Sequence, residues 1–321
     1  EKEFVSAVNT LLEKGMERLL FDLRGNSGGF LEQAAAISDQ FITTVDTLVY
    51  TKGKIKESNQ VFKSTPRKGN NTLSLIILIN RGSASASEIV SGAVQDLDRG
   101  LIVGETSFGK GLVQRQLPLD TGSAIRVTIA RYYTPSGRLI QRPFEDGSDL
   151  AYYQELYSVN REEKIDSLKE LRPKYNTRSG RVVYGGGGIT PDIYIPYENK
   201  INSETIKVLR NAKRPFFNFA SKEAGPIGEK YDSFRDFKND WEPNDSMISN
   251  FFNFLDADTI TVNRDSLMLD IDYIKNQIKS ELAGSVWGKN ESANIRLLFD
   301  NQVLEALKHF NEADAFIGSI N

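Results

Sequence analysis

The sequence predicts an α/β fold, with a core of mixed sheet and helices followed by a mainly helical C-terminal domain. Between Arg18 and Arg142, short apolar runs alternate with helix-like segments, which is typical of an α/β core. The 321 residues exceed the roughly 100–200 expected of one domain. Beyond Pro196 the composition shifts to helical periods. We therefore expect a core over 1–196 and a helical domain over 197–321.

The predicted elements of the core follow from periodicity. A helix over 1–15 carries Phe4, Val8, Leu11 and Leu12 on one stripe and ends at Gly15. Buried strands are expected at 18–24, 73–80 and 100–105, with helices at 31–42 and 87–97. A strand should precede the first helix, so we expect this chain to be a fragment of a longer protein.

The second half of the core is predicted to depart from simple alternation. Segments 112–119 and 123–134 have the pattern of a hairpin that turns at Asp120 to Gly122, which makes the sheet mixed. Residues 145–180 are polar and charged, and we interpret them as an insertion with a short helix. The following strand and glycine turn are expected to rejoin the core.

Composition excludes several classes of function. The chain has 40 Lys and Arg against 43 Asp and Glu, a net charge of −3. It therefore lacks the overall positive charge that is typical of nucleic-acid-binding proteins. Cysteine is absent, which removes disulfides and thiolate chemistry. The one histidine, His309, lies in an amphipathic helical stretch and is interpreted as a surface or interface residue. A nucleophile in this chain needs a base other than histidine.

No apolar run approaches the ~20 residues that span a bilayer, and no signal-peptide core opens the chain. The sequence predicts neither a metal site nor a cofactor.

Three glycine- or serine-rich turns follow predicted buried strands, at 24–29, 81–88 and 104–111. Ligands and catalytic groups gather at the carboxyl ends of strands in α/β sheets, so these turns are expected to converge. The third turn matches the start of a phosphate-binding loop, but Gly111 stands where such a loop needs Ser or Thr, and a strand pattern follows. A nucleotide site is the less favoured interpretation.

Ser85 has two interpretations. Ser85 and Glu88 have the spacing of a capping box, so Ser85 could simply begin the helix. A serine at a helix N-terminus is also a favourable nucleophile, because free N–H groups there can bind an oxyanion.

Lys110, in the third turn, is either a solvated loop lysine or a base. Partial burial beside Phe108 and Val113 would lower the pKa of its amine, which would allow it to take a proton from a serine. Together with Ser85 it would form a Ser-Lys dyad.

The run GSASASEIVSGAVQDLDRGLIVGETSFGKGLVQ closely resembles the carboxyl-terminal processing peptidases, also called tail-specific proteases. DLRGNSGG upstream, with YYTPSGRLIQ and GGGGITPDIYIP downstream, extends the resemblance over roughly residues 1–196. It implies that Ser85 is the nucleophile and Lys110 the general base. It further implies that Gln114 orients the lysine and that the N–H groups of Gly29 and Ala86 form the oxyanion hole. Asp96 is interpreted as structural support or as an ordinary helix-face residue.

The resemblance also implies a crotonase/ClpP-like core and a serine endopeptidase that cleaves proteins near their free C-termini without a cofactor. Family members usually carry a PDZ domain before this core, and none is visible here. The resemblance implies export to the periplasm or cell envelope. Homo-oligomerisation, and membrane association through a segment outside this chain, are both compatible with the sequence. The rival interpretation is a non-catalytic, protease-like module that binds peptides while Ser85 caps the helix.

Overall fold

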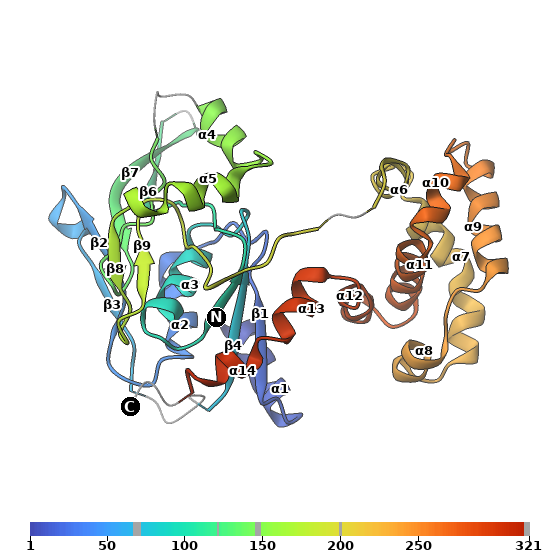
Figure 1. The fold of residues 1–321 in the computed structure, drawn as a ribbon, viewed down its shortest axis with the longest axis horizontal. Helices are drawn as coiled ribbons and strands as arrows, with labels where there is room; N and C mark the ends of the chain where they lie inside the picture. The colour runs from blue at the N-terminus through green and yellow to red at the C-terminus, as the bar shows by residue number, and fades with distance from the viewer. Residues whose placement is uncertain (67–71, 121, 145–148, 199–200, 318–321) are drawn as a thin grey trace. The chain divides into compact units, whose positions relative to one another are not determined.

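A computed structural model describes residues 1–66, 72–120, 122–144, 149–198 and 201–317 (Figure 1). The chain forms two compact units. The first comprises Glu1–Tyr197 and Glu305–Asn321, and the second comprises Glu198–Leu304.

A parallel sheet forms the base of the first unit. Its order is β1-β4-β5-β10, built from Arg18–Asp22, Ser74–Ile79, Leu101–Gly104 and Ile193–Tyr194. Every residue of β4 and β5 is buried. Strands covered on both faces are apolar throughout, which explains the uninterrupted run in β4.

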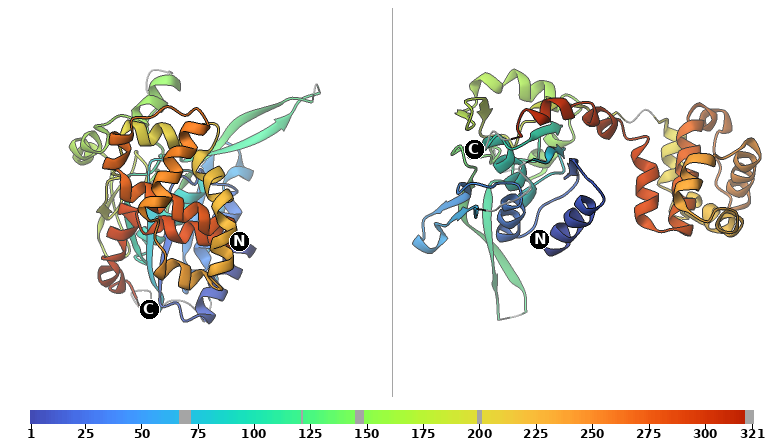
Figure 2. Two further views of the ribbon diagram at one scale, coloured as in Figure 1. Left: turned by 90° about the vertical axis from the view of Figure 1, so that its right-hand side faces the viewer. Right: turned by 90° about the horizontal axis from the view of Figure 1, so that it is seen from below.

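A second, antiparallel sheet has the order β3-β2-β7-β6, built from Val61–Lys63, Thr47–Gly53, Ala124–Tyr133 and Leu112–Pro118. Figure 2 shows the β6–β7 hairpin reaching out beyond the rest of this unit. The predicted hairpin is present, although residue 121 of its turn lies outside the described residues. The parallel and antiparallel strands occupy separate sheets, whereas the sequence suggested a single mixed one.

Two helices, α2 (Leu31–Asp39) and α3 (Ala86–Asp96), lie between the sheets. Their inward residues share one apolar core with both sheets, which includes Ala34, Val90, Ile77 and Tyr132. A further helix, α1 (Lys2–Glu13), packs Phe4 on β1, with a ring-to-ring distance of 4.9 Å to Phe21. The mixed α/β class expected from the sequence is confirmed.

The segment predicted as an insertion contains α4 (Asp149–Leu156), α5 (Arg161–Ser167) and a short 3-10 helix, Lys169–Leu171. Residues 145–148 of that segment lie outside the described part. Strands β8 (Lys174–Asn176) and β9 (Val182–Tyr184) then form a two-stranded sheet. The chain returns to the parallel sheet through β10, as expected. A second 3-10 helix, Lys56–Ser58, lies between β2 and β3.

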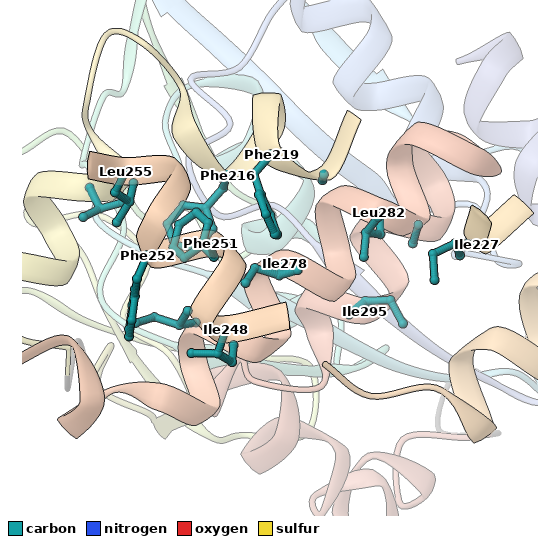
Figure 3. Close-up of a cluster of buried hydrophobic side chains, with 14 of the residues drawn as sticks. Phe216, Phe219, Ile227, Ile248, Phe251, Phe252, Leu255, Ile278, Leu282 and Ile295 are labelled. Carbon is teal, nitrogen blue, oxygen red and sulfur yellow. The ribbon is translucent and has the colours of Figure 1, made fainter. Parts of the chain in front are cut away.

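The second unit is helical. Its helices α6 to α12 are Ser203–Leu209, Pro215–Lys230, Phe234–Asp240, Asp245–Ala257, Arg264–Leu269, Ile271–Val286 and Lys289–Leu297. Asn202, Ser233, Asn244 and Asn263 cap α6, α8, α9 and α10 through their side chains. These caps satisfy backbone N–H groups that have no partner within the helix. Figure 3 shows the core of this unit, where Phe216 stacks on Phe251 with ring centroids 4.7 Å apart. The buried aromatic residues of this unit therefore form a packed core.

The chain returns to the first unit at its C-terminal end. Helix α13 (Asn301–Leu307) spans the boundary, and α14 (Phe310–Asp314) packs near β4. Phe310 is buried, and Asp314 pairs with Arg18 of β1 at 2.9 Å. The helical domain was predicted over 197–321, and the described residues 305–317 group with the first unit, where Phe310 is buried.

No helix within the described ranges is both long enough and apolar enough to cross a membrane.

Candidate active site

The three turns predicted to converge lie beside one another at the carboxyl ends of β1, β4 and β5. The amide of Ala84 donates to the carbonyl of Asn26 at 3.0 Å, which joins the first turn to the second. The amide of Phe108 donates to the carbonyl of Ser83 at 2.9 Å, which joins the second turn to the third. The order of parallel strands explains this convergence.

The three serines of the second turn have different environments. Ser83 Oγ donates to the carbonyl of Leu23 at 2.7 Å, and Ser87 Oγ donates to the carbonyl of Asn26 at 2.9 Å. These two hydroxyls hold the first turn against the second. Ser85 instead lines a cavity of about 620 Å³ and is half-buried.

The backbone of Ser85 adopts φ 56° and ψ −113°, in a region that favours glycine. An ordinary capping residue has extended backbone with negative φ. A non-glycine residue in such a conformation costs on the order of 1–3 kcal/mol and needs surrounding contacts to hold it. The predicted capping box with Glu88 is also present. Ser85 therefore begins α3 from a strained turn.

Glu88 connects the Ser85 turn to the Lys110 loop. Its carboxylate accepts the amides of Ser85 at 2.8 Å, Gly109 at 2.6 Å and Lys110 at 2.9 Å. It also accepts the hydroxyl of Ser107 at 2.5 Å. Burial raises the pKa of Glu88 to about 7, partly offset by the donors from Ser107, Lys110, Gly109 and Ser85. One fully buried carboxylate thus fixes the backbone on both sides of the proposed dyad.

Tyr132 of β7 makes a second connection between the same two residues. Its hydroxyl contacts the backbone carbonyl of Ser85 at 3.2 Å and hydrogen-bonds to the carbonyl of Lys110. Burial, with the nearby charge of Glu88, raises the pKa of Tyr132 well above its ordinary value, so the phenol keeps its proton. Sequence reasoning missed this role, because Tyr132 reads only as an inward-facing strand residue.

Gly28 allows the first turn to approach the Ser85 turn closely. Its φ is +95°, and a Cβ atom there would lie 2.6 Å from the Ala84 carbonyl oxygen and 2.6 Å from the Ala86 nitrogen. Its amide donates to the Asn26 side chain at 2.9 Å. Gly29, the predicted oxyanion-hole residue, lines the cavity, and a Cβ atom there would meet nothing within 4 Å. Ala86 is the first residue of α3, so its N–H has no acceptor within the helix.

The cavity brings together several residues that are distant in sequence. Ser85, Lys110, Gln114 and Gly29 all line it, and Lys110 is half-buried. Among the residues that the structure describes, no hydrogen bond joins Ser85 Oγ to Lys110 Nζ, nor Gln114 to Lys110. Gln114 lies on β6, beside an irregularity in its pairing with β7. Ser85 and Lys110 thus border one cavity without a direct hydrogen bond between their side chains.

Asp96 lies in a buried ionic network behind the site. Its carboxylate is 2.7 Å from the guanidinium of Arg138, and both side chains are fully buried. It also accepts the amide of Ser136 at 3.0 Å. Asp96 does not line the cavity, so its place is that of structural support.

Two other predictions concern His309 and the phosphate-binding loop. His309 contacts Glu312 at 3.1 Å and borders none of the cavity. Strand β6, rather than a helix, follows Gly111, so the loop lacks the helix N-terminus that a phosphate-binding loop requires. Within the described ranges, no group of three or more His, Asp or Glu side chains is placed to hold a metal ion.

Two separate parts of the chain match known protein families. Residues 1–146 match the family described as peptidase family S41. Residues 212–288 match a family of unknown function.

Individual relatives cover the first region. A carboxy-terminal-processing protease of Bartonella bacilliformis is 45% identical over 142 residues, which is 44% of this chain and 31% of that protein. The carboxyl-terminal-processing peptidase 1, chloroplastic, of Arabidopsis thaliana is 38% identical over 135 residues, 42% of this chain and 27% of that protein. The carboxy-terminal processing protease CtpA of Bacillus subtilis is 36% identical over 141 residues, 44% of this chain and 30% of that protein. This chain therefore aligns with less than a third of the length of these relatives.

Among solved structures, a photosystem II D1 C-terminal processing protease is 26% identical, with a TM-score of 0.41. The match covers 60% of this chain and 38% of that one. Over residues 1–146, the chain matches peptidase family S41 and is similar in sequence to the carboxy-terminal-processing proteases.

Proposed function

We propose that the protein is a serine endopeptidase that cleaves protein substrates near their C-termini. One observation carries the proposal: Ser85, in a strained turn, and Lys110 border the same cavity, and Glu88 and Tyr132 tie their backbones together. A residue that only capped a helix would need no backbone strain. The family match over residues 1–146 supports the same reaction class.

In the proposed mechanism, the amine of Lys110 takes the proton of Ser85 Oγ as that oxygen attacks the scissile carbonyl carbon. The carbonyl oxygen becomes an oxyanion that accepts the N–H groups of Gly29 and Ala86. The intermediate collapses, the C–N bond breaks, and the lysine ammonium returns its proton to the leaving amine. Lys110 then deprotonates a water that attacks the Ser85 ester. The ester C–O bond breaks, the lysine ammonium returns its proton to Ser85 Oγ, and the acid leaves.

Gln114 has an orienting role in this proposal. It lines the cavity with Lys110, and its amide oxygen could accept a hydrogen bond from the amine once substrate orders the site. The mechanism needs no metal or cofactor. We further propose export to the periplasm or cell envelope, protein or peptide substrates with free C-termini, and no nucleic-acid partner.

The dyad is tested by replacing Ser85 and Lys110 separately with Ala. Each change should reduce cleavage of a C-terminally tagged protein by about 1,000-fold or more, measured by mass spectrometry of the products. Ser6→Ala and Lys54→Ala alter exposed residues of the same unit and should cleave normally. A second measurement uses an acylating serine probe, whose adduct should map to Ser85 and weaken strongly in Lys110→Ala.

A non-catalytic peptide-binding module predicts different results. Ser85→Ala would then cost about 1 kcal/mol of stability through the lost cap and leave no kinetic trace. Full cleavage activity in a folded Lys110→Ala variant would refute the dyad.

A further inference from the structure

The first unit contains a second cavity, of about 590 Å³, that the proposed peptidase mechanism does not use. It lies between the segment after β7, the helices α4 and α5, and the glycine turn before β10. Four cationic side chains and one carboxylate, Glu155, border it. The cations are Arg142, Arg161, Lys164 and Arg172.

The charges around this cavity are not balanced. Arg142 forms an ion pair with Glu155, and Arg161 pairs with Glu162 at 2.9 Å. Arg172 has no carboxylate partner among the residues that the structure describes, and its Nε donates to the carbonyl of Gly185 at 2.9 Å. Burial, with the nearby charges of Arg138 and Arg161, lowers the pKa of Arg172 to about 10, so it stays charged at neutral pH.

Three guanidinium nitrogens at this site are buried without a hydrogen-bond acceptor. They are Nε of Arg142, Nε of Arg161 and Nη2 of Arg172. The side chain of Arg161 is only 4% exposed, and its Nε lies 3.8 Å from Glu155, beyond hydrogen-bond distance. Unmade hydrogen bonds on buried charged groups are costly, so such donors usually serve a ligand or water.

Part of the remaining wall is apolar. Pro143, Ile165, Leu168 and Leu171 border the cavity, and the Leu171 side chain is 81% exposed. A bare inorganic ion would make no favourable contact with these apolar side chains. A ligand with an oxyanionic head and an apolar body would satisfy both the guanidinium donors and the apolar wall.

We propose that this cavity binds the C-terminal carboxylate of a peptide whose last side chain is apolar. The choice of a peptide rests on the proposed peptidase function, whereas the preference for an oxyanion rests on the arginines alone. The carboxylate would accept from Arg172, with Arg142 and Arg161 behind it, and the apolar side chain would lie against Ile165 and Leu168.

The test measures binding rather than cleavage, in the Ser85→Ala variant of the whole chain. The probe is an N-terminally fluorescein-labelled tetrapeptide ending in leucine, either as the free acid or as the C-terminal amide, followed by polarisation at constant ionic strength. The free acid should bind about tenfold or more tightly than the amide, because the amide cannot accept charge-assisted bonds from arginine. The result does not depend on whether the peptide can be cleaved, so it is separate from the test of the dyad.

Three further variants locate the site. Arg172→Gln should abolish the difference between acid and amide, while Arg115→Gln removes the same charge from an exposed position on β6 and should preserve it. Lys164→Gln changes an exposed residue on the cavity rim, so folding should be unaffected and acid binding should weaken severalfold. Thermal unfolding of each variant checks that the fold is retained.

Other outcomes overturn the proposal. Equal binding of acid and amide would mean that no carboxylate is recognised. An acid preference that survives both Arg172→Gln and Lys164→Gln would place recognition elsewhere. If inorganic phosphate alone binds, and loses its affinity in Arg172→Gln, the cavity is a site for free oxyanions rather than for peptide ends.

Discussion

Glu88 is the residue whose chemistry most directly controls the Ser85 turn. Its two oxygens accept three backbone amides and one hydroxyl, all from the turns that carry Ser85 and Lys110. Glu88→Gln replaces one of these acceptor oxygens with an NH₂ donor that would face other donors. We expect cleavage to fall by about 10- to 100-fold, with the loss in kcat, because a 1.4 kcal/mol change corresponds to a tenfold rate effect. Steady-state kinetics would show it, and an unchanged kcat would exclude the clamping role.

The same residue predicts a pH dependence of stability. The pKa of Glu88 is about 7 in the folded protein and 4.5 as its ordinary value, so between these values the folded state holds more protons than the unfolded state. Its contribution to the free energy of unfolding therefore falls as pH rises from 4.5 to 7. The stability of the natural protein relative to Glu88→Gln should drop by about 3 kcal/mol across this window. Urea unfolding at several pH values measures the difference, and a flat difference would contradict the raised pKa.

Asp96 and Arg138 predict a different kind of loss. Both side chains are fully buried, and their charged groups lie 2.7 Å apart. Asp96→Ala would leave a buried guanidinium without its counter-ion, and we expect a loss of about 3–5 kcal/mol in the free energy of unfolding. The double variant Asp96→Ala, Arg138→Met should recover part of that loss. Additive effects of the two changes would mean that the pair is not coupled.

The first turn depends on Gly28 for its close approach to the Ser85 turn. Gly28→Ala introduces both an unfavourable positive φ and a Cβ atom 2.6 Å from backbone atoms of Ala84 and Ala86. Gly25 is the matched control, because its φ is +66° and a Cβ atom there would meet nothing within 4 Å. Gly25→Ala should cost about 1 kcal/mol through strain alone. Gly28→Ala should cost more and should also reduce cleavage, and equal effects in stability and activity would refute the role of close approach.

The elements of the core could be predicted because their signals are local. The apolar run of β4, the small residues of α3 and the turn between β6 and β7 are each visible in a few consecutive residues. The division into a parallel and an antiparallel sheet could not be predicted in this way. It depends on Tyr50 and Tyr133 becoming neighbours, and those residues are far apart in the sequence.

The site was predictable to a similar degree. Strand order brings the three glycine- and serine-rich turns together, so their convergence follows from sequence. The contacts of Tyr132 with the backbone of Ser85 and Lys110 depend on the packing of one sheet over the other, which periodicity does not reveal. Glu88 was visible only as a capping residue, because its bonds to Gly109 and Lys110 join segments that are separate in the chain.

The two units can be followed separately in solution. The chain has two tryptophans, Trp241 and Trp287, and both lie in the helical unit. Phe310, by contrast, is buried in the first unit, with the guanidinium of Arg18 5.5 Å from its ring centroid. Phe310→Ala should destabilise the first unit by about 3 kcal/mol and leave tryptophan-detected unfolding unchanged.

Leu307→Ala is the control for this prediction, because Leu307 belongs to the same returning segment and is 47% exposed. Leu307→Ala should leave the unfolding transitions of both units unchanged. Tryptophan fluorescence would report the second unit alone, whereas far-UV circular dichroism would report both units. A transition seen only by circular dichroism therefore belongs to the first unit. A shift of the fluorescence transition in Phe310→Ala would show that the two units unfold together.

The return of residues 305–317 to the first unit makes the helical unit an insert with two covalent attachments. A single nick among its helices would therefore not release the terminal piece, which would stay docked through Phe310 and the Arg18–Asp314 pair. The same topology makes the insert exchangeable. A foreign helical module joined between residues 197 and 305 would have the same two covalent attachments, and no strand of either sheet would be disturbed.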